Sequence, residues 1–158
     1  MHEAGHAVVA VLLGLTARAF LEDGRPGCGE CQIVVPAGPE GADRLLIALV
    51  AGGEAEGRLL GQPRRWLAST DDARAMLRVV GALSRPGAAE RIAHAKREAA
   101  RMLRERSVWK ATEAVAEELA RRSHVSDATV REAVVAAGLS PGAGSSPPRS
   151  PASRGRTR

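Results

Sequence analysis

The chain is almost without aromatic residues, with no Tyr, one Phe and two Trp among its 158 residues. Aromatic side chains often dominate core packing, so this core must be built from Ala, Val, Leu and Ile, which suits closely packed helices. At this length we expect one domain that buries a core of its own.

Long apolar runs are also missing. No segment approaches the roughly 18 consecutive apolar residues that span a bilayer. No basic segment is followed by an apolar run and a cleavage site, as in a secretory signal. We therefore expect a cytoplasmic protein without a membrane segment.

Acidic residues are absent from the last twenty positions, which carry Arg149, Arg154, Arg156 and Arg158. The formal net charge is +5, so subtracting these four leaves +1 for residues 1–138. From Ser140 onward the Pro, Ser, Gly and Arg composition cannot form a core. The sequence predicts a domain over residues 1–138 and a disordered basic tail over 139–158.

Cysteine is scarce, since Cys28 and Cys31 are the only two. A structural zinc knuckle would need two more ligands nearby. We expect two free thiols in a loop.

The first residues carry a His-Glu-x-x-His pattern, with His2, Glu3 and His6. Histidines four apart lie on the same helical face, so both imidazoles can reach one metal ion. Glu3 lies about 100° around the helix, where it can act as a general base on a metal-activated water. The apolar residues 7–13 continue the helix into a core, and Gly14 is a candidate C-terminal cap.

The next segments predict a hairpin and a glycine-containing helix. Residues 16–22 and 31–35 alternate in polarity around turn residues 23–27. Residues 42–60 follow a helical pattern that contains Gly52 and Gly53. Glycines weaken a helix, so we expect another backbone to pack closely there, with the first helix at Gly5 as the candidate.

The remaining pattern is helical, and it predicts a mainly α, α+β domain with one short hairpin. The expected helices begin near Ser69 or Thr70 and cover 87–104, 107–122 and 126–137, the last with Ser126 as N-cap and Gly138 at its end.

A catalytic zinc usually has three protein ligands and one open position. Placing Asp72 inward puts Ala73, Met76, Val79 and Val80 on the buried face, whereas placing Asp71 inward buries Arg74 and Arg78. Asp72 fits better, although Ser69 and Asp72 also fit a capping box at a helix start. The candidates for the third ligand were Cys28, Cys31, Glu54, Glu56, Asp71, Asp72, His94 and His124. We assign no role to the two histidines among them.

Three stretches together resemble the peptidase domain of the FtsH-type ATP-dependent zinc metalloproteases. They are the zinc-helix motif at 2–7, the glycine-rich stretch at 51–61 and Ser69-Thr70-Asp71-Asp72. Aligned without a gap from Gly61, the family's third zinc ligand falls on Asp72, while Asp71, the alternative ligand, stands where asparagine is usual. The resemblance covers about residues 1–138, because the C-terminal helices also look like the family's helical bundle.

The resemblance implies a zinc metalloendopeptidase with His2, His6 and Asp72 as Zn²⁺ ligands and Glu3 as general base. Glu56 matches an acid of the glycine-rich helix, which implies a supporting role beside the ligands. The implied partners are a polypeptide substrate and, as open possibilities, a separate AAA+ ATPase and further copies of the chain. No Gly-x-x-x-x-Gly-Lys-Ser/Thr occurs, so the chain itself is not expected to bind ATP.

Two other functions stay open from the sequence. One is a peptidase-like scaffold that no longer cuts. The other is a nucleic-acid or partner-binding module that uses Arg121, Arg122, the helix after them and the basic tail. We favour a bundle helix with a solvated tail over nucleic-acid binding, because no basic stripe lies on that helix.

Overall fold

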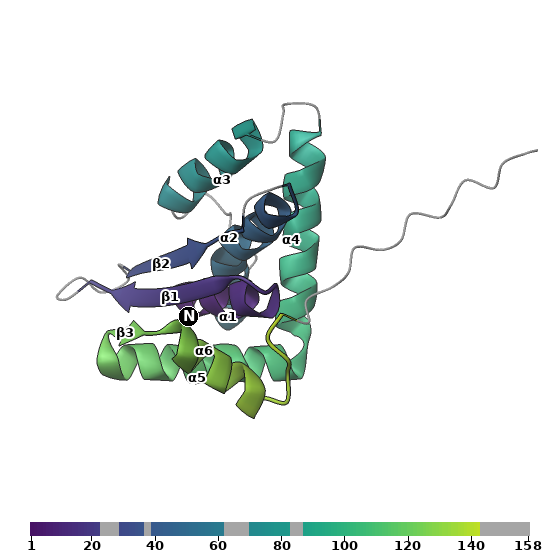
Figure 1. The fold of residues 1–158 in the computed structure, drawn as a ribbon. Coiled ribbons are helices and arrows are strands. Elements are labelled where there is room, and N and C mark those ends of the chain that lie inside the picture. The colour runs from purple at the N-terminus through teal and green to yellow at the C-terminus, as the bar shows by residue number, and fades with distance from the viewer. Residues whose placement is uncertain (23–28, 37–38, 62–69, 83–86, 143–158) are drawn as a thin grey trace, which may run out of the picture.

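The computed structural model describes residues 1–22, 29–36, 39–61, 70–82 and 87–142. These residues form a mainly helical α+β structure, as the sequence predicts (Figure 1). Its elements are α1 (His2–Leu12), β1 (Thr16–Leu21), β2 (Gly29–Val34), α2 (Pro39–Leu59), α3 (Thr70–Ala82), α4 (Ala88–Arg104), α5 (Arg106–Arg122), β3 (His124–Val125) and α6 (Asp127–Ala136).

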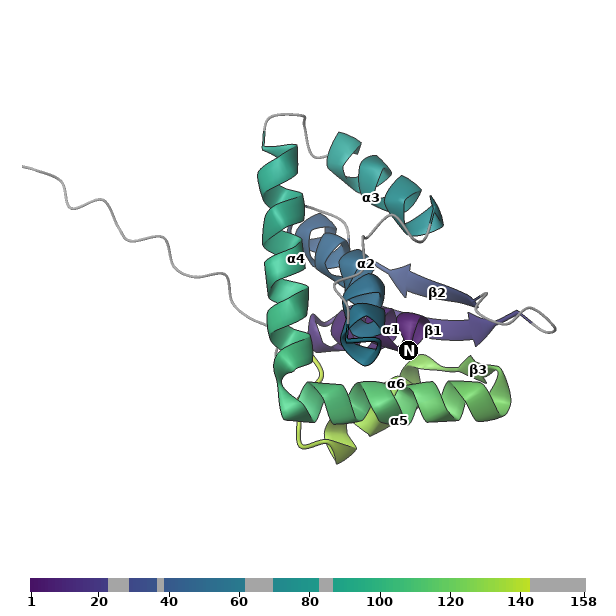
Figure 2. The ribbon, with the colours of Figure 1, turned by 180° about the vertical axis from the view of Figure 1, so that it is seen from behind.

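Helix α1 is the centre of the core. Its residues from Ala4 to Leu12 are all buried, because the helix is apolar on every side and can therefore be covered on every side. It packs against α2, α5, α6 and the sheet (Figures 1 and 2). The helix ends as predicted, since Gly14 adopts a φ of +78° and the Leu15 amide donates to the Ala10 carbonyl at 2.9 Å.

Helices α1 and α2 approach closely at Gly5, as the sequence predicts. A Cβ at Gly5 would lie 2.7 Å from the Ala55 Cβ and 2.8 Å from the Ala51 carbonyl oxygen. The expectation that a backbone packs against the two α2 glycines is correct only in naming α1 as the neighbour of Gly52. The nearest atoms to a Cβ at Gly52 belong to the His6 ring and not to the α1 backbone, and Gly53 has nothing within 4 Å of its would-be Cβ.

The predicted hairpin is confirmed, and β1 and β2 pair antiparallel with Thr16 opposite Val34. Strand β2 begins at Gly29, two residues earlier than expected. Strand β3 was not predicted, because two residues are too few to show a periodicity, and it pairs with β1 through Val125 opposite Ala19. The order β2-β1-β3 leaves β2 at one edge of the sheet.

The expectation that both cysteines lie in a loop is wrong for Cys31, which lies within β2. It is a free thiol, as expected. Cys28 lies outside the described residues.

The C-terminal helices match their predicted ranges closely. The Ser126 hydroxyl accepts the Thr129 amide at 3.2 Å, so the predicted N-cap of α6 is confirmed. The described chain continues past residue 138, with Leu139 packed on the core and the Gly142 amide donating to the Val11 carbonyl at 3.0 Å. The predicted disordered tail over 139–158 therefore starts too early, because residues 139–142 are ordered against the core. The rest of it, residues 143–158, lies outside the described residues.

None of the helices that the structure describes is both long enough and apolar enough to cross a bilayer.

Candidate metal centre

Helix α1 directs both histidines of the motif to the same side. The rings of His2 and His6 have centroids 4.7 Å apart and are steeply inclined to each other. His2 lies in the first turn with 23% of its side chain exposed, whereas the His6 side chain is only 3% exposed. The His2 imidazole is therefore partly open to solvent, whereas the His6 imidazole is enclosed by the fold.

The backbone of α2 orients the His6 imidazole. Its Nδ1 lies 2.7 Å from the Ala48 carbonyl oxygen and 3.3 Å from the Gly52 amide nitrogen. One ring nitrogen cannot donate to the first and accept from the second, and the shorter contact identifies Nδ1 as the donor. This contact directs the other nitrogen, Nε2, toward Asp72, and in the neutral imidazole Nε2 carries the lone pair that a metal ligand requires.

Gly52 provides the space for the His6 ring. A Cβ at this position would lie 2.3 Å from Nε2 and 2.6 Å from Cε1 of His6. Real Cβ atoms do not approach so closely, so any larger residue would displace the imidazole.

Gly52→Ala should therefore weaken zinc binding about tenfold or more and cost about 1–3 kcal/mol of unfolding free energy through overpacking. Gly53→Ala is the matched control, because its Cβ would enter open space, and it should stabilise the helix by about 0.5–1 kcal/mol. Zinc titration and urea unfolding of both variants measure these effects. Equal zinc affinity in the two variants would contradict the role assigned to Gly52.

Asp72 completes a group of three at the start of α3. Its Oδ2 lies 2.8 Å from His2 Nε2 and 3.3 Å from His6 Nε2. Asp71 points elsewhere, with 90% of its side chain exposed and an ion pair to Arg74 at 3.2 Å. The structure thus brings Asp72, and not its neighbour, to the histidines.

Glu56 lies behind His2 on α2. Its Oε2 is 3.2 Å from His2 Nδ1, so the Nδ1 proton can be donated to this carboxylate while Nε2 faces Asp72. A carboxylate in this position orients a ligating imidazole and raises its basicity.

Glu3 lies against the start of β2. A Cβ at Gly29 would be 2.7 Å from the Glu3 Cγ, so the glycine leaves room for this side chain. Burial raises the pKa of Glu3 above its ordinary value, although the nearby His6 and His2 imidazoles act in the opposite direction. A carboxylate with a raised pKa is better suited to accept and return a proton.

The charges within the group favour an ionised Asp72. Burial by itself raises the pKa of Asp72, but the hydrogen bond to His2 and the adjacent His6 imidazole outweigh it, and the pKa lies well below its usual range. Burial lowers the pKa of His2, yet Asp72 and Glu3 reverse this, so the pKa is raised overall. An anionic carboxylate between two imidazoles is a suitable donor set for a divalent cation.

The three residues fit a metal ion on two further observations. One donor atom from each of His2, His6 and Asp72 lies within 4.8 Å of the others, so the group could hold a metal ion. The buried His6 Nε2 makes no hydrogen bond among the described residues, and its ion-pair contact is the Asp72 carboxylate at 3.3 Å, so its hydrogen-bonding capacity is not fully used. A bound cation would satisfy it.

The other ligand candidates lie outside this group. Glu54, His94 and His124 do not belong to it, and His124 instead contacts the Arg122 carbonyl at 3.2 Å. Burial, followed by the charges of Glu3 and Asp72, raises the pKa of the Cys31 thiol well above its usual range. Cys31 is therefore a neutral thiol near the site.

Sequence reasoning missed two contributions to the site. The Ala48 carbonyl that holds His6 is a backbone atom, so no residue type marks it. Gly29 was visible as a glycine beside the first cysteine, but the sequence could not indicate that Glu3 would approach it. Both depend on which elements pack together.

Comparison of the chain with models of known protein families and with curated proteins finds no match to either.

Proposed function

We propose that this chain is a zinc-dependent metalloendopeptidase, with His2, His6 and Asp72 as the zinc ligands and Glu3 as the general base. The observation that carries the proposal is the convergence of the three donors, with the buried His6 Nε2 at 3.3 Å from Asp72 Oδ2. The resemblance of the three sequence stretches to the FtsH-type peptidase domain supports the same function.

Zn²⁺ in this group would polarise a peptide carbonyl and lower the pKa of water toward neutrality. Glu3 takes the proton from water as the water attacks the carbonyl, and then returns it to the departing amine. The raised pKa of Glu3, caused by burial, suits both halves of this transfer. Glu56 acts through His2, because it holds the Nδ1 proton at 3.2 Å and so keeps Nε2 directed to the site.

The sheet offers a place for the substrate. Strand β2 has an unpaired edge within the described sheet, and it begins beside Glu3 at Gly29. An extended polypeptide can add to such an edge through main-chain hydrogen bonds. This arrangement favours a polypeptide over a small molecule as the substrate.

The test is hydrolysis of an unfolded protein, which needs no ATPase to unfold it. The purified chain should cleave fluorescently labelled casein, lose the activity when 1,10-phenanthroline removes the metal, and regain it with an equimolar amount of Zn²⁺. A protein that binds zinc tightly and leaves casein intact would instead be the inert scaffold.

Within the described residues, the charges on α5 and α6 give no support to a nucleic-acid interface. Arg121 and Arg122 both pair with Glu118, and Arg131 pairs with Asp127 at 2.5 Å. Paired arginines are less available to phosphates, so we retain the peptidase as the proposed function.

A further inference from the structure

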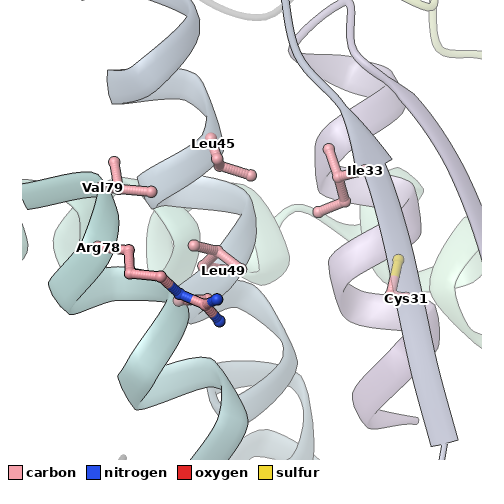
Figure 3. Close-up of a pocket in the computed structure, with 7 residues that line it drawn as sticks. Cys31, Ile33, Leu45, Leu49, Arg78 and Val79 are labelled. Atoms are coloured by element: carbon pink, nitrogen blue, oxygen red, sulfur yellow. The ribbon is translucent and has the colours of Figure 1, made fainter. Parts of the chain in front are cut away.

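A cavity of about 280 Å³ lies between β2, α2 and α3 (Figure 3). Binding sites for drug-sized ligands usually measure about 300–1,000 Å³, so this cavity is just below that range. Its size suits one side chain of a larger ligand better than a whole cofactor.

The cavity lies on the face of α3 that also carries Asp72. Ala75 and Val79, which line it, follow Asp72 by three and seven residues. Residues at these spacings lie on one helical face. The face of α3 that presents Asp72 to the histidines therefore also forms a wall of the cavity.

The other two walls show the same continuity. On α2, Leu49 lines the cavity and lies three residues before Gly52, which contacts the His6 ring. On β2, Cys31 and Ile33 line it and alternate with the same phase as Gly29, which contacts the candidate base. Alternate residues of a strand share a face. The three elements that line the cavity thus also contribute residues to the metal centre or contact it.

The lining is apolar except at one end. Ile33, Leu45, Leu49 and Val79 supply hydrocarbon walls, and Arg78 is the only charged residue among the lining residues. Figure 3 shows the Arg78 side chain extending from α3 past Leu49. Arg78 is exposed and has no ion-pair partner among the residues that the structure describes. The cavity therefore combines an apolar interior with one available guanidinium.

We propose that this cavity binds a glutamate side chain of the substrate next to the cleaved bond, and that Arg78 selects it. The glutamate methylenes pack against Leu49 and Val79, and its carboxylate pairs with the guanidinium, which can hold a carboxylate with two parallel hydrogen bonds. This inference rests on the proposed peptidase function, because it assigns the substrate preference of that site.

Peptide binding to the full-length Glu3→Gln variant tests the preference without cleavage. The peptides are blocked at both ends and carry Glu, Gln or Leu at one central position in an Ala/Ser host. Fluorescence anisotropy should show the Glu peptide binding about three- to tenfold more tightly than the Gln peptide, a modest factor because the guanidinium is exposed. Higher salt should reduce the difference.

Arg78→Met in the same background should abolish the difference between the Glu and Gln peptides. Arg74→Met is the matched control on the same helix, since Arg74 is exposed, pairs with Asp71 and does not line the cavity, and it should keep the preference. A further peptide ends in Leu and has a free C-terminal carboxylate. It tests whether Arg78 binds the carboxylate of a chain terminus instead of that of a glutamate side chain.

Equal binding of the Glu and Gln peptides, no binding of any peptide, or a preference that survives Arg78→Met would overturn the proposal. So would tighter binding of the peptide with the free terminus than of the blocked Glu peptide. The two failures are distinguishable. Casein cleavage without a glutamate preference removes only this inference. An Arg78-dependent preference in a chain that cleaves nothing removes the peptidase and the role of the cavity in substrate selection, and leaves only a glutamate-binding cavity.

Discussion

Glu3→Gln should abolish casein hydrolysis while the protein keeps its zinc. A glutamine has nearly the same shape and cannot accept a proton, so the expected loss of rate is about 10²–10⁴-fold, the usual contribution of a general base. In the proposed site the three ligand atoms come from His2, His6 and Asp72, so the metal content should stay unchanged. Initial cleavage rates and the zinc content of dialysed protein measure the two effects.

Glu113→Gln is the control for this change. Glu113 is exposed on α5, so the same loss of charge should leave the rate unchanged. Hydrolysis by Glu3→Gln at the wild-type rate would remove Glu3 from the mechanism. Loss of zinc from Glu3→Gln would mean that the glutamate supports the metal and would contradict its assignment as a base alone.

Asp72→Ala should release the zinc and, with it, the activity. Losing a residue that only orients a ligand costs about 10–100-fold in metal affinity, so losing a ligand should cost on the order of a hundredfold or more. Asp72 Oδ2 also lies 2.8 Å from His2 Nε2, and its removal takes the only carboxylate out of the ligand group. Competition with a fluorescent zinc chelator gives the affinity, and circular dichroism verifies the fold.

Asp71→Ala is a closely matched control, because the two acids are adjacent in the first turn of α3. The side chain of Asp71 is 90% exposed and pairs with Arg74, so its removal should change zinc affinity by less than about twofold, as expected of a surface charge. If Asp71→Ala lost the metal and Asp72→Ala retained it, the third ligand would be Asp71, and the assignment of Asp72 would be wrong.

Much of the fold was predictable because it depends on local pattern. The apolar residues of α1 identified a buried helix, and the alternation around residues 23–27 identified the hairpin. Gly14, Ser126 and Gly138 marked helix ends, because positive φ angles and side-chain caps are properties of single residues. The start of β2 was placed two residues late and β3 was missed, since strand limits depend on the partner strand.

The candidate site was likewise predictable only where its residues lie close together in the sequence. His2, Glu3 and His6 were predictable because a spacing of four residues on one helix fixes their relative positions. Asp72 is seventy residues from His2, and periodicity could indicate only that it faces inward. The same periodicity left Gly52 and Gly53 equivalent, although only one of them contacts a histidine ring.

The sequence by itself determined the residue types, the helical face that carries the two imidazoles and the order of the elements, because these follow from short-range geometry. Only the tertiary structure decided that Asp72 meets both histidines, that the Ala48 carbonyl holds His6, and that Gly29 accommodates Glu3. The packing of α1 against α2 and β2, and of α3 against α2, sets these contacts, and such packing depends on the shapes of surfaces that are distant in the chain.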